Sequence, residues 1–116
     1  MSAPVKQNIT MKEVDAVDVR VGTILQVDDV PASRKLVQLT VDFGDFQRKI
    51  CVGFKNEREN PKEVEGKQAL FIVNLPPKEM AGVVSEGMIF DIGYQDGIKP
   101  VLAVPEEKVP NGTRLG

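Results

Sequence analysis

The sequence has no histidine and one cysteine, and these two shortages exclude several kinds of chemistry. Without histidine there is no imidazole base, no Ser-His-Asp triad and no His-ligated metal. Cys51 alone forms neither an internal disulfide nor a cysteine cluster on zinc. We therefore expect no metal and no cofactor. A single unpaired cysteine suits a reducing compartment.

Long apolar runs are also missing, since no stretch approaches the roughly 20 residues of a transmembrane helix. The first ten residues lack the apolar segment of a signal peptide, so we expect a cytoplasmic protein without membrane insertion. The net charge of −2 argues against indiscriminate nucleic-acid binding but permits a local basic patch. A length of 116 residues fits one domain. We expect a mobile lead-in over residues 1–9 and a folded domain over residues 10–116.

Alternating apolar and polar residues predict β-strands in two early segments, residues 17–28 and 37–43. The residues predicted to point inward are Val17, Val19, Val21, Leu25 and Val27 in the first segment, and Val37, Leu39, Val41 and Phe43 in the second. Gly22 interrupts the first segment and indicates a bend or a bulge. Before these strands, Thr10 and Glu13 have the spacing of a helix capping box, which predicts a short N-terminal helix.

Turn signals separate the remaining strands. Gly44-Asp45 predicts a two-residue hairpin of type II′, because glycine stands first. It joins the second segment to a third over residues 46–54. Residues 68–73 are apolar at both alternating sets of positions, as in a central strand that is buried on both faces. Residues 88–92 and 101–104 predict two more short strands.

Five or six short strands with little helix favour a small closed barrel. The predicted fold is all-β: a five-stranded Greek-key barrel of the OB type, with a short N-terminal helix and a C-terminal extension. A small SH3-like barrel is the alternative, because strand count alone does not separate the two.

The segment from residue 74 to residue 88, NLPPKEMAGVVSEGM, is the most unusual part of the chain. Its prolines stiffen the backbone, and Gly82 and Gly87 let backbone or ligand approach closely. Asn74 and Ser85 offer short hydrogen-bonding groups, and Lys78 adds a positive charge. By composition alone this segment is an ordinary surface loop between two strands, with Met88 in the core.

Five blocks of sequence in the same order resemble the tRNA-binding-domain family. The blocks are residues 18–24 (DVRVGTI), 35–36 with 41–44 (KL and VDFG), 74–78 (NLPPK), 82–88 (GVVSEGM) and 109–113 (VPNGT). That family includes free-standing dimeric tRNA-binding proteins, the C-terminal domain of many methionyl-tRNA synthetases, and CsaA-type chaperones associated with protein export. The doubled Pro76-Pro77 is similar to the CsaA branch, whereas residues 85–88 are similar to the tRNA-binding branch.

The resemblance implies an OB-fold homodimer that binds tRNA by its folded shape, without strong sequence specificity. The RNA-binding residues that it implies are Arg34, Lys35, Asn74, Lys78, Ser85 and Met88, with Gly82 and Gly87 keeping the approach open. Arg34 is included for its charge and its position beside Lys35. The implied partners are tRNA and a second copy, with an aminoacyl-tRNA synthetase or an unfolded export client as further partners.

Two other functions remain as alternatives. A CsaA-like chaperone would bind peptides in apolar grooves, with Met80, Val83, Val84 and Met88 as candidates. An enzyme would have Glu79 and Glu86 as a carboxylate pair, but no nucleophile accompanies them, so we expect no enzymatic activity.

Charge and aromatic content are consistent with binding of a folded RNA. Residues 34–62 carry a net charge of +3, from seven basic and four acidic residues, whereas the whole chain carries −2. A segment with such a charge is usually a solvated surface with scattered charges. Aromatic residues are few, and the phenylalanines fall mostly on apolar parities, so general coating of single strands is not expected.

Overall fold

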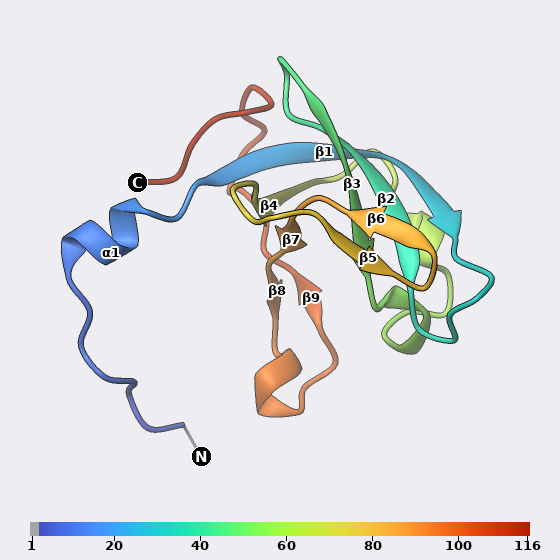
Figure 1. Cartoon of the computed structure of the whole chain (residues 1–116), viewed down its shortest axis with the longest axis horizontal. Helices are drawn as coiled ribbons and strands as arrows, with labels where there is room; N and C mark the ends of the chain where they lie inside the picture. Colours follow the sequence, from blue (N-terminus) through green and yellow to red (C-terminus); the bar gives the residue numbers. More distant parts are fainter. Residues whose placement is uncertain (1–2) are drawn as a thin grey trace.

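The chain folds into a nearly closed antiparallel β-barrel, seen in a computed structural model that describes residues 3–116 (Figure 1). The five-stranded sheet has the order β3-β2-β1-β4-β7, and every neighbouring pair is antiparallel. These strands are β1 (Val19–Asp29), β2 (Val37–Asp42), β3 (Gln47–Val52), β4 (Gln68–Ile72) and β7 (Met88–Ile89). The predicted five-stranded barrel is confirmed.

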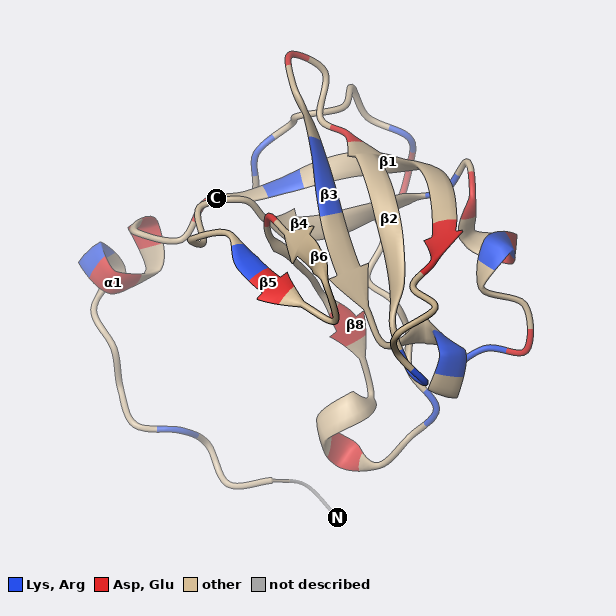
Figure 2. Ribbon diagram, turned by 45° about the vertical axis from the view of Figure 1, so that its right-hand side comes forward, with Lys and Arg blue, Asp and Glu red and all other residues tan. Residues whose placement is uncertain are grey.

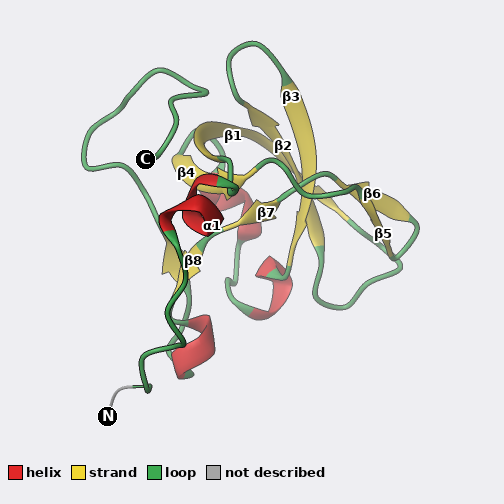
Figure 3. Cartoon of the chain, turned by 60° about the vertical axis from the view of Figure 1, so that its left-hand side comes forward, coloured by secondary structure: helices red, strands yellow, loops and turns green. Residues whose placement is uncertain are grey.

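Short elements surround this sheet (Figure 3). They are the helix α1 (Met11–Asp15), the 3-10 turns η1 (Phe54–Asn56), η2 (Pro61–Val64) and η3 (Tyr94–Asp96), and the strands β5 (Lys78–Met80), β6 (Val83–Ser85), β8 (Asp91–Ile92) and β9 (Val101–Leu102). Strands β5 and β6 pair as one hairpin, and β8 pairs with β9. We call residues 91–102 the arm, because this segment projects from the barrel in Figure 1.

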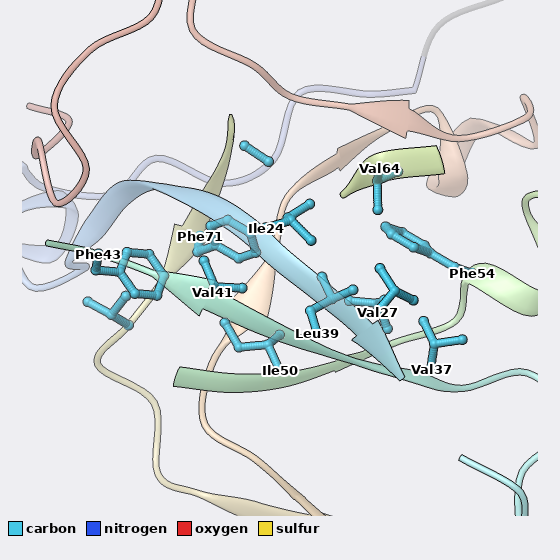
Figure 4. Packing of buried hydrophobic residues seen from close by; sticks show 13 residues of the cluster. Ile24, Val27, Val37, Leu39, Val41, Phe43, Ile50, Phe54, Val64 and Phe71 are labelled. Atoms are coloured by element: carbon cyan, nitrogen blue, oxygen red, sulfur yellow. The ribbon is translucent and has the colours of Figure 1, made fainter. Parts of the chain in front are cut away.

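Phenylalanine and aliphatic side chains fill the barrel interior (Figure 4). Phe43 packs edge-on against Phe71, with ring centroids 5.4 Å apart, and stacks on Phe46 at 5.2 Å. Ile24 and Ile50 are completely buried beside them. Burying each such side chain contributes roughly 1.5–3 kcal/mol. Because the interior is filled, candidates for ligand contact lie on the outer surface and the loops.

Strand β1 departs from the predicted inward face. Its register against β2 shifts between Ile24 and Gln26, which is a β-bulge at Leu25. Ile24 is buried and Leu25 is 45% exposed, so the prediction that Leu25 points inward was wrong. The extra residue reverses the alternation, and Val27 is again buried beyond it. Val21 is buried as well, where the C-terminal segment runs along β1 and the Gly112 amide donates to the Val21 carbonyl at 2.8 Å.

The predicted hairpin at Gly44-Asp45 joins β2 to β3. Gly44 has a φ of +90°, which its lack of a side chain permits, and the Phe43 amide donates to the Phe46 carbonyl at 2.9 Å. The predicted alternation of β2 is also confirmed, since Val37, Leu39 and Val41 are all buried.

Residues 85–87 close the gap between β3 and the other edge of the sheet. The Glu86 amide donates to the Lys49 carbonyl at 2.7 Å, and the Lys49 amide donates to the Glu86 carboxylate at 2.9 Å. One residue earlier, the Ser85 hydroxyl accepts from the Cys51 amide at 2.9 Å. Here a side-chain carboxylate and a hydroxyl accept hydrogen bonds from backbone amides of β3. Elsewhere in the sheet, carbonyls of a neighbouring strand accept such bonds.

The N-terminal segment contains the predicted capping box. The Thr10 amide donates to the Glu13 carboxylate at 3.0 Å, and the Glu13 amide donates back to the Thr10 hydroxyl at 3.1 Å. Residues 1 and 2 of the predicted lead-in lie outside the described residues, and residues 3–9 are exposed and form neither helix nor strand. Among residues 3–116, no helix has the length and apolar character needed to cross a membrane.

Candidate nucleic-acid interface

The loop between β1 and β2, residues 30–36, presents the two cations that sequence patterns single out. Arg34 and Lys35 are exposed, and neither side chain has a hydrogen bond or ion pair with another residue of 3–116. Ser33 orders this turn, since its hydroxyl accepts from the amides of Lys35 and Leu36 at 3.2 and 3.0 Å. The loop therefore holds its backbone in place while its cations face solvent.

Lys55 clamps this loop to the barrel. Its ammonium donates to the carbonyls of Val30 at 3.0 Å and Ser33 at 2.8 Å, and it forms an ion pair with Asp29. A lysine that the sequence counts toward a basic patch is therefore committed to the protein itself. Its role is to fix the loop that carries Lys35.

The β5–β6 hairpin carries Lys78 and packs beside the same loop. Composition predicts an irregular loop over residues 74–88, but Ala81 and Gly82, with φ of 51° and 85°, form a tight two-residue turn between paired strands. Met80 and Val83 pack against the buried cluster of Val30, Leu36 and Cys51, which includes both ends of loop 30–36. The tertiary structure therefore brings the hairpin and the loop together.

Ser85 does not face solvent. It is 5% exposed, and its hydroxyl accepts from the Cys51 amide and donates to the Gly87 carbonyl at 3.3 Å. The prediction of direct RNA contact by this hydroxyl conflicts with that burial. Burial also raises the pKa of the Cys51 thiol, an effect that the nearby Ser85 side chain partly opposes. Cys51 thus behaves as a small apolar side chain under the hairpin.

Asn74 is exposed, but both ends of its amide are engaged. Its oxygen accepts from the Asp18 amide at 2.9 Å, and its nitrogen donates to the Ala16 carbonyl at 2.7 Å. The side chain thereby ties the segment after α1 to the end of β4. Asp18 in turn forms a bidentate pair with Arg20 at 2.9 and 3.0 Å, and this bonding lowers the pKa of the Asp18 carboxyl.

The two glycines and Met88 have different surroundings. Gly82 supplies the positive φ of the hairpin turn, and no atom of residues 3–116 beyond its chain neighbours lies within 4 Å of where its Cβ would be. A Cβ on Gly87 would come within 2.6 Å of the Ile72 carbonyl oxygen, so this glycine allows the chain to approach itself. Met88 pairs with Ile72 and is 42% exposed, so it presents apolar surface to solvent and is not the core residue that composition predicts.

Most of the cations in residues 34–62 have partners within the protein. Arg48 donates to the carbonyls of Val73 and Glu86, Arg58 pairs with Glu63, and Lys62 donates to the Val27 carbonyl. Lys49 donates to the Thr40 hydroxyl at 2.7 Å but remains exposed. Figure 2 shows basic segments on β3 and on β5, with an acidic segment directly after the basic one in β5. The open cations are therefore fewer than the sequence count implies.

Across residues 3–116, histidine, cysteine and carboxylate side chains form no group of three that could hold a metal ion. What the arrangement offers is a set of open cations, Arg34, Lys35 and Lys78, on a loop and a hairpin that pack together. Small antiparallel barrels of the OB class use such loops to bind oligonucleotides. The fold and the site together define an OB-type binding domain.

The chain belongs to the tRNA-binding-domain family. Residues 19–114 match the family model described as "Putative tRNA binding domain". The resemblance and the fold class drawn from sequence blocks are thus confirmed.

Curated relatives include methionine–tRNA ligases from Archaeoglobus fulgidus and Parabacteroides distasonis. The first is 40% identical over 110 residues, covering 95% of this chain and 16% of the ligase. The second is 38% identical over 112 residues, covering 97% of this chain and 16% of the ligase. The chain therefore spans about a sixth of the length of these relatives.

Similar solved structures come from both branches of the family. A MetRS-related protein from Pyrococcus horikoshii has a TM-score of 0.86 and 34% identity, covering 96% of this chain and all of that one. The chaperone CsaA from Bacillus anthracis has a TM-score of 0.81 and 28% identity, covering 95% of this chain and all of that one. Likeness to both agrees with the mixed motifs of residues 74–88.

Proposed function

We propose that this protein binds tRNA by its folded shape and does not itself catalyse a reaction. The observation that carries the proposal is the packing of loop 30–36 against the β5–β6 hairpin, which puts open cations on adjoining elements of a tRNA-binding family fold. Cations on a rigid framework read the spacing of phosphates without reading bases. Exposed aromatic pairs for coating single strands are not part of this surface.

The site residues divide by role in this proposal. Lys35, Lys78 and Arg34 pair with phosphates, and Met88 supplies an apolar surface under a sugar or a base. Asn74 and Ser85 do not contact RNA in this proposal. They position the hairpin, because their hydrogen bonds hold the chain at its two ends. Gly82 and Gly87 permit the turn and the closure that place Lys78.

A second copy of the chain is the partner we propose for the N-terminal face. Exposed apolar residues of α1 and the segments beside it line a hollow of about 680 Å³. They include Ile9, Met11, Val14, Val17 and Leu115, all at least 43% exposed. Contiguous apolar surface of this kind marks an interaction site. Light scattering at micromolar concentration tests the homodimer, and a monomer would contradict it.

The family relatives suggest where such a domain works. We propose a cytoplasmic protein that holds tRNA for a methionine–tRNA ligase, either as part of such an enzyme or as a separate chain. Co-purification with that ligase in the presence and in the absence of tRNA tests the association.

A gel shift with three competing ligands tests the tRNA proposal. Intact tRNA, a duplex RNA of equal length and an unfolded peptide are each offered to the same protein sample. We expect retention of tRNA over the duplex, because the proposed recognition depends on the folded shape of tRNA. Retention of the peptide alone would favour the CsaA-like chaperone, for which the likeness to CsaA is the supporting observation. Equal retention of tRNA and duplex would contradict recognition of shape.

A further inference from the structure

A cleft of about 570 Å³ lies between the arm and the barrel. Its apolar walls are formed by Leu36, Val52, Met80, Tyr94, Ile98 and Pro100. Tyr94 lines the cleft and is 69% exposed, so much of its side chain is accessible to a ligand. The volume is in the range of small-molecule sites and accommodates a nucleobase with its sugar.

Besides two lysines, an amide and two carboxylate side chains line this cleft and have no side-chain partner within the described chain. The side chains of Asn56, Glu57 and Asp91 form no hydrogen bond or ion pair with another residue of 3–116. Glu57 is half-buried, and burial, followed by the nearby Asp91 carboxylate, raises the pKa of its carboxyl. A half-buried acceptor without a donor is stabilised by a ligand that brings one.

The cleft is continuous with the proposed tRNA surface. Lys35 belongs to loop 30–36 and also lines the cleft, and Lys99 of the arm is a second exposed cation there. A nucleotide placed in the cleft would have its phosphates near Lys35, which the proposed function already uses, and near Lys99. This continuity favours RNA over a peptide as the occupant.

The carboxylate distinguishes among the four bases. Guanine presents two adjacent donors, N1–H and N2–H, which match the two oxygens of a carboxylate. At their Watson–Crick edges, adenine, cytosine and uracil each place a donor beside at least one acceptor. They therefore do not offer a carboxylate two adjacent donors. Bases that leave the stack of a folded RNA are commonly held on aromatic rings and read at their Watson–Crick edge.

We propose that this cleft binds one unpaired guanine of a folded RNA, stacked on Tyr94 and hydrogen-bonded to Glu57. The inference rests on the proposed function, because it adds the reading of a single base to a surface otherwise bound by shape. Lys35 and Lys99 then face the flanking phosphates.

Nuclear magnetic resonance of the ¹⁵N-labelled full chain tests the cleft directly, with GMP, AMP, CMP and UMP as probes. The amides of Gly53 and Gly97 report on the two sides of the cleft. We expect GMP to shift both signals with an affinity about tenfold above that of the other three nucleotides. Glu57→Gln should remove this preference. Tyr94→Ala should lower GMP affinity at least fivefold, whereas Tyr94→Phe should keep it.

The same variants in a tRNA gel shift separate this proposal from the proposed function. Leu25→Ala, at an exposed apolar side chain outside the cleft, is the matched control. Retention of tRNA by the unaltered protein, without any GMP response at 10 mM (about the upper limit for a useful site), would overturn the guanine cleft alone. Equal responses to all four nucleotides, or a response only to a peptide, would also overturn it. Selective GMP binding without tRNA binding would contradict the proposed function and leave the cleft standing.

Discussion

The Ser85 hydroxyl lies 2.9 Å from the Cys51 amide nitrogen and accepts its hydrogen bond, across 34 positions of sequence. This bond replaces a ladder bond at the edge of β3, where the barrel would otherwise be open. It anchors the β5–β6 hairpin, and with it Lys78, to the barrel wall. A side chain expected to touch RNA instead positions the element that carries a cation.

Replacing Ser85 with alanine is expected to destabilise the fold. The change leaves the buried Cys51 amide without its acceptor, which costs about 1–3 kcal/mol in the free energy of unfolding. Urea denaturation measures the loss, with Val84→Ala at an exposed neighbour as the control. Unchanged stability of Ser85→Ala would show that water or another group readily replaces the hydroxyl.

Lys35→Ala and Lys78→Ala are expected to change the salt dependence of tRNA binding. If about three phosphates are neutralised per protomer, the log–log slope of affinity against salt is roughly −2 to −3. Each substitution removes one phosphate contact and should reduce the slope by about one. The unfolding free energy should stay the same, because neither ammonium has a partner in the described chain. An unchanged slope for both variants would remove them from the interface.

Lys55→Met, unlike Lys35→Ala and Lys78→Ala, is expected to lower the stability of the fold. The variant loses the ammonium that holds the Val30 and Ser33 carbonyls, so unfolding should require about 1–3 kcal/mol less free energy. The freed loop should show faster amide exchange at Lys35 and Leu36. Lys35→Ala is the matched control, since it removes an open cation from the same loop. Equal exchange rates in the two variants would argue against a clamp.

Acid should remove a small stabilisation that comes from Asp18. Its pKa is lowered in the folded protein, first by the hydrogen bonds from Arg20, so the folded state binds fewer protons than the unfolded state. The contribution is therefore complete above the unfolded value of about 3.9 and disappears as the pH falls through the lower folded value. Asp18→Asn should flatten stability against pH below about 4. The effect is modest because the Asp18 side chain is 33% exposed. An identical acid limb in the variant would contradict this assignment.

The sequence by itself determined much of the barrel. Period-two alternation over 37–43, the glycine-first hairpin at Gly44 and the capping box at Thr10 each depend on residues close in the chain, and each was found as predicted. Family blocks spread over residues 18–113 identified the fold and the family, since several matches in order are far more specific than any one.

Only the tertiary structure decided which polar groups face solvent. The β-bulge at Leu25 reversed the inward face of β1. One extra residue in the strand exchanges the inward and outward positions on one side of the bulge relative to the other. Lys55 and Lys35 look alike in sequence, yet one is bonded to loop carbonyls and the other is open. The Ser85 hydroxyl accepts a hydrogen bond from the Cys51 amide, a partner that no local sequence pattern indicates. Long-range contacts assign these hydrogen bonds, and alternation and composition describe only short-range order.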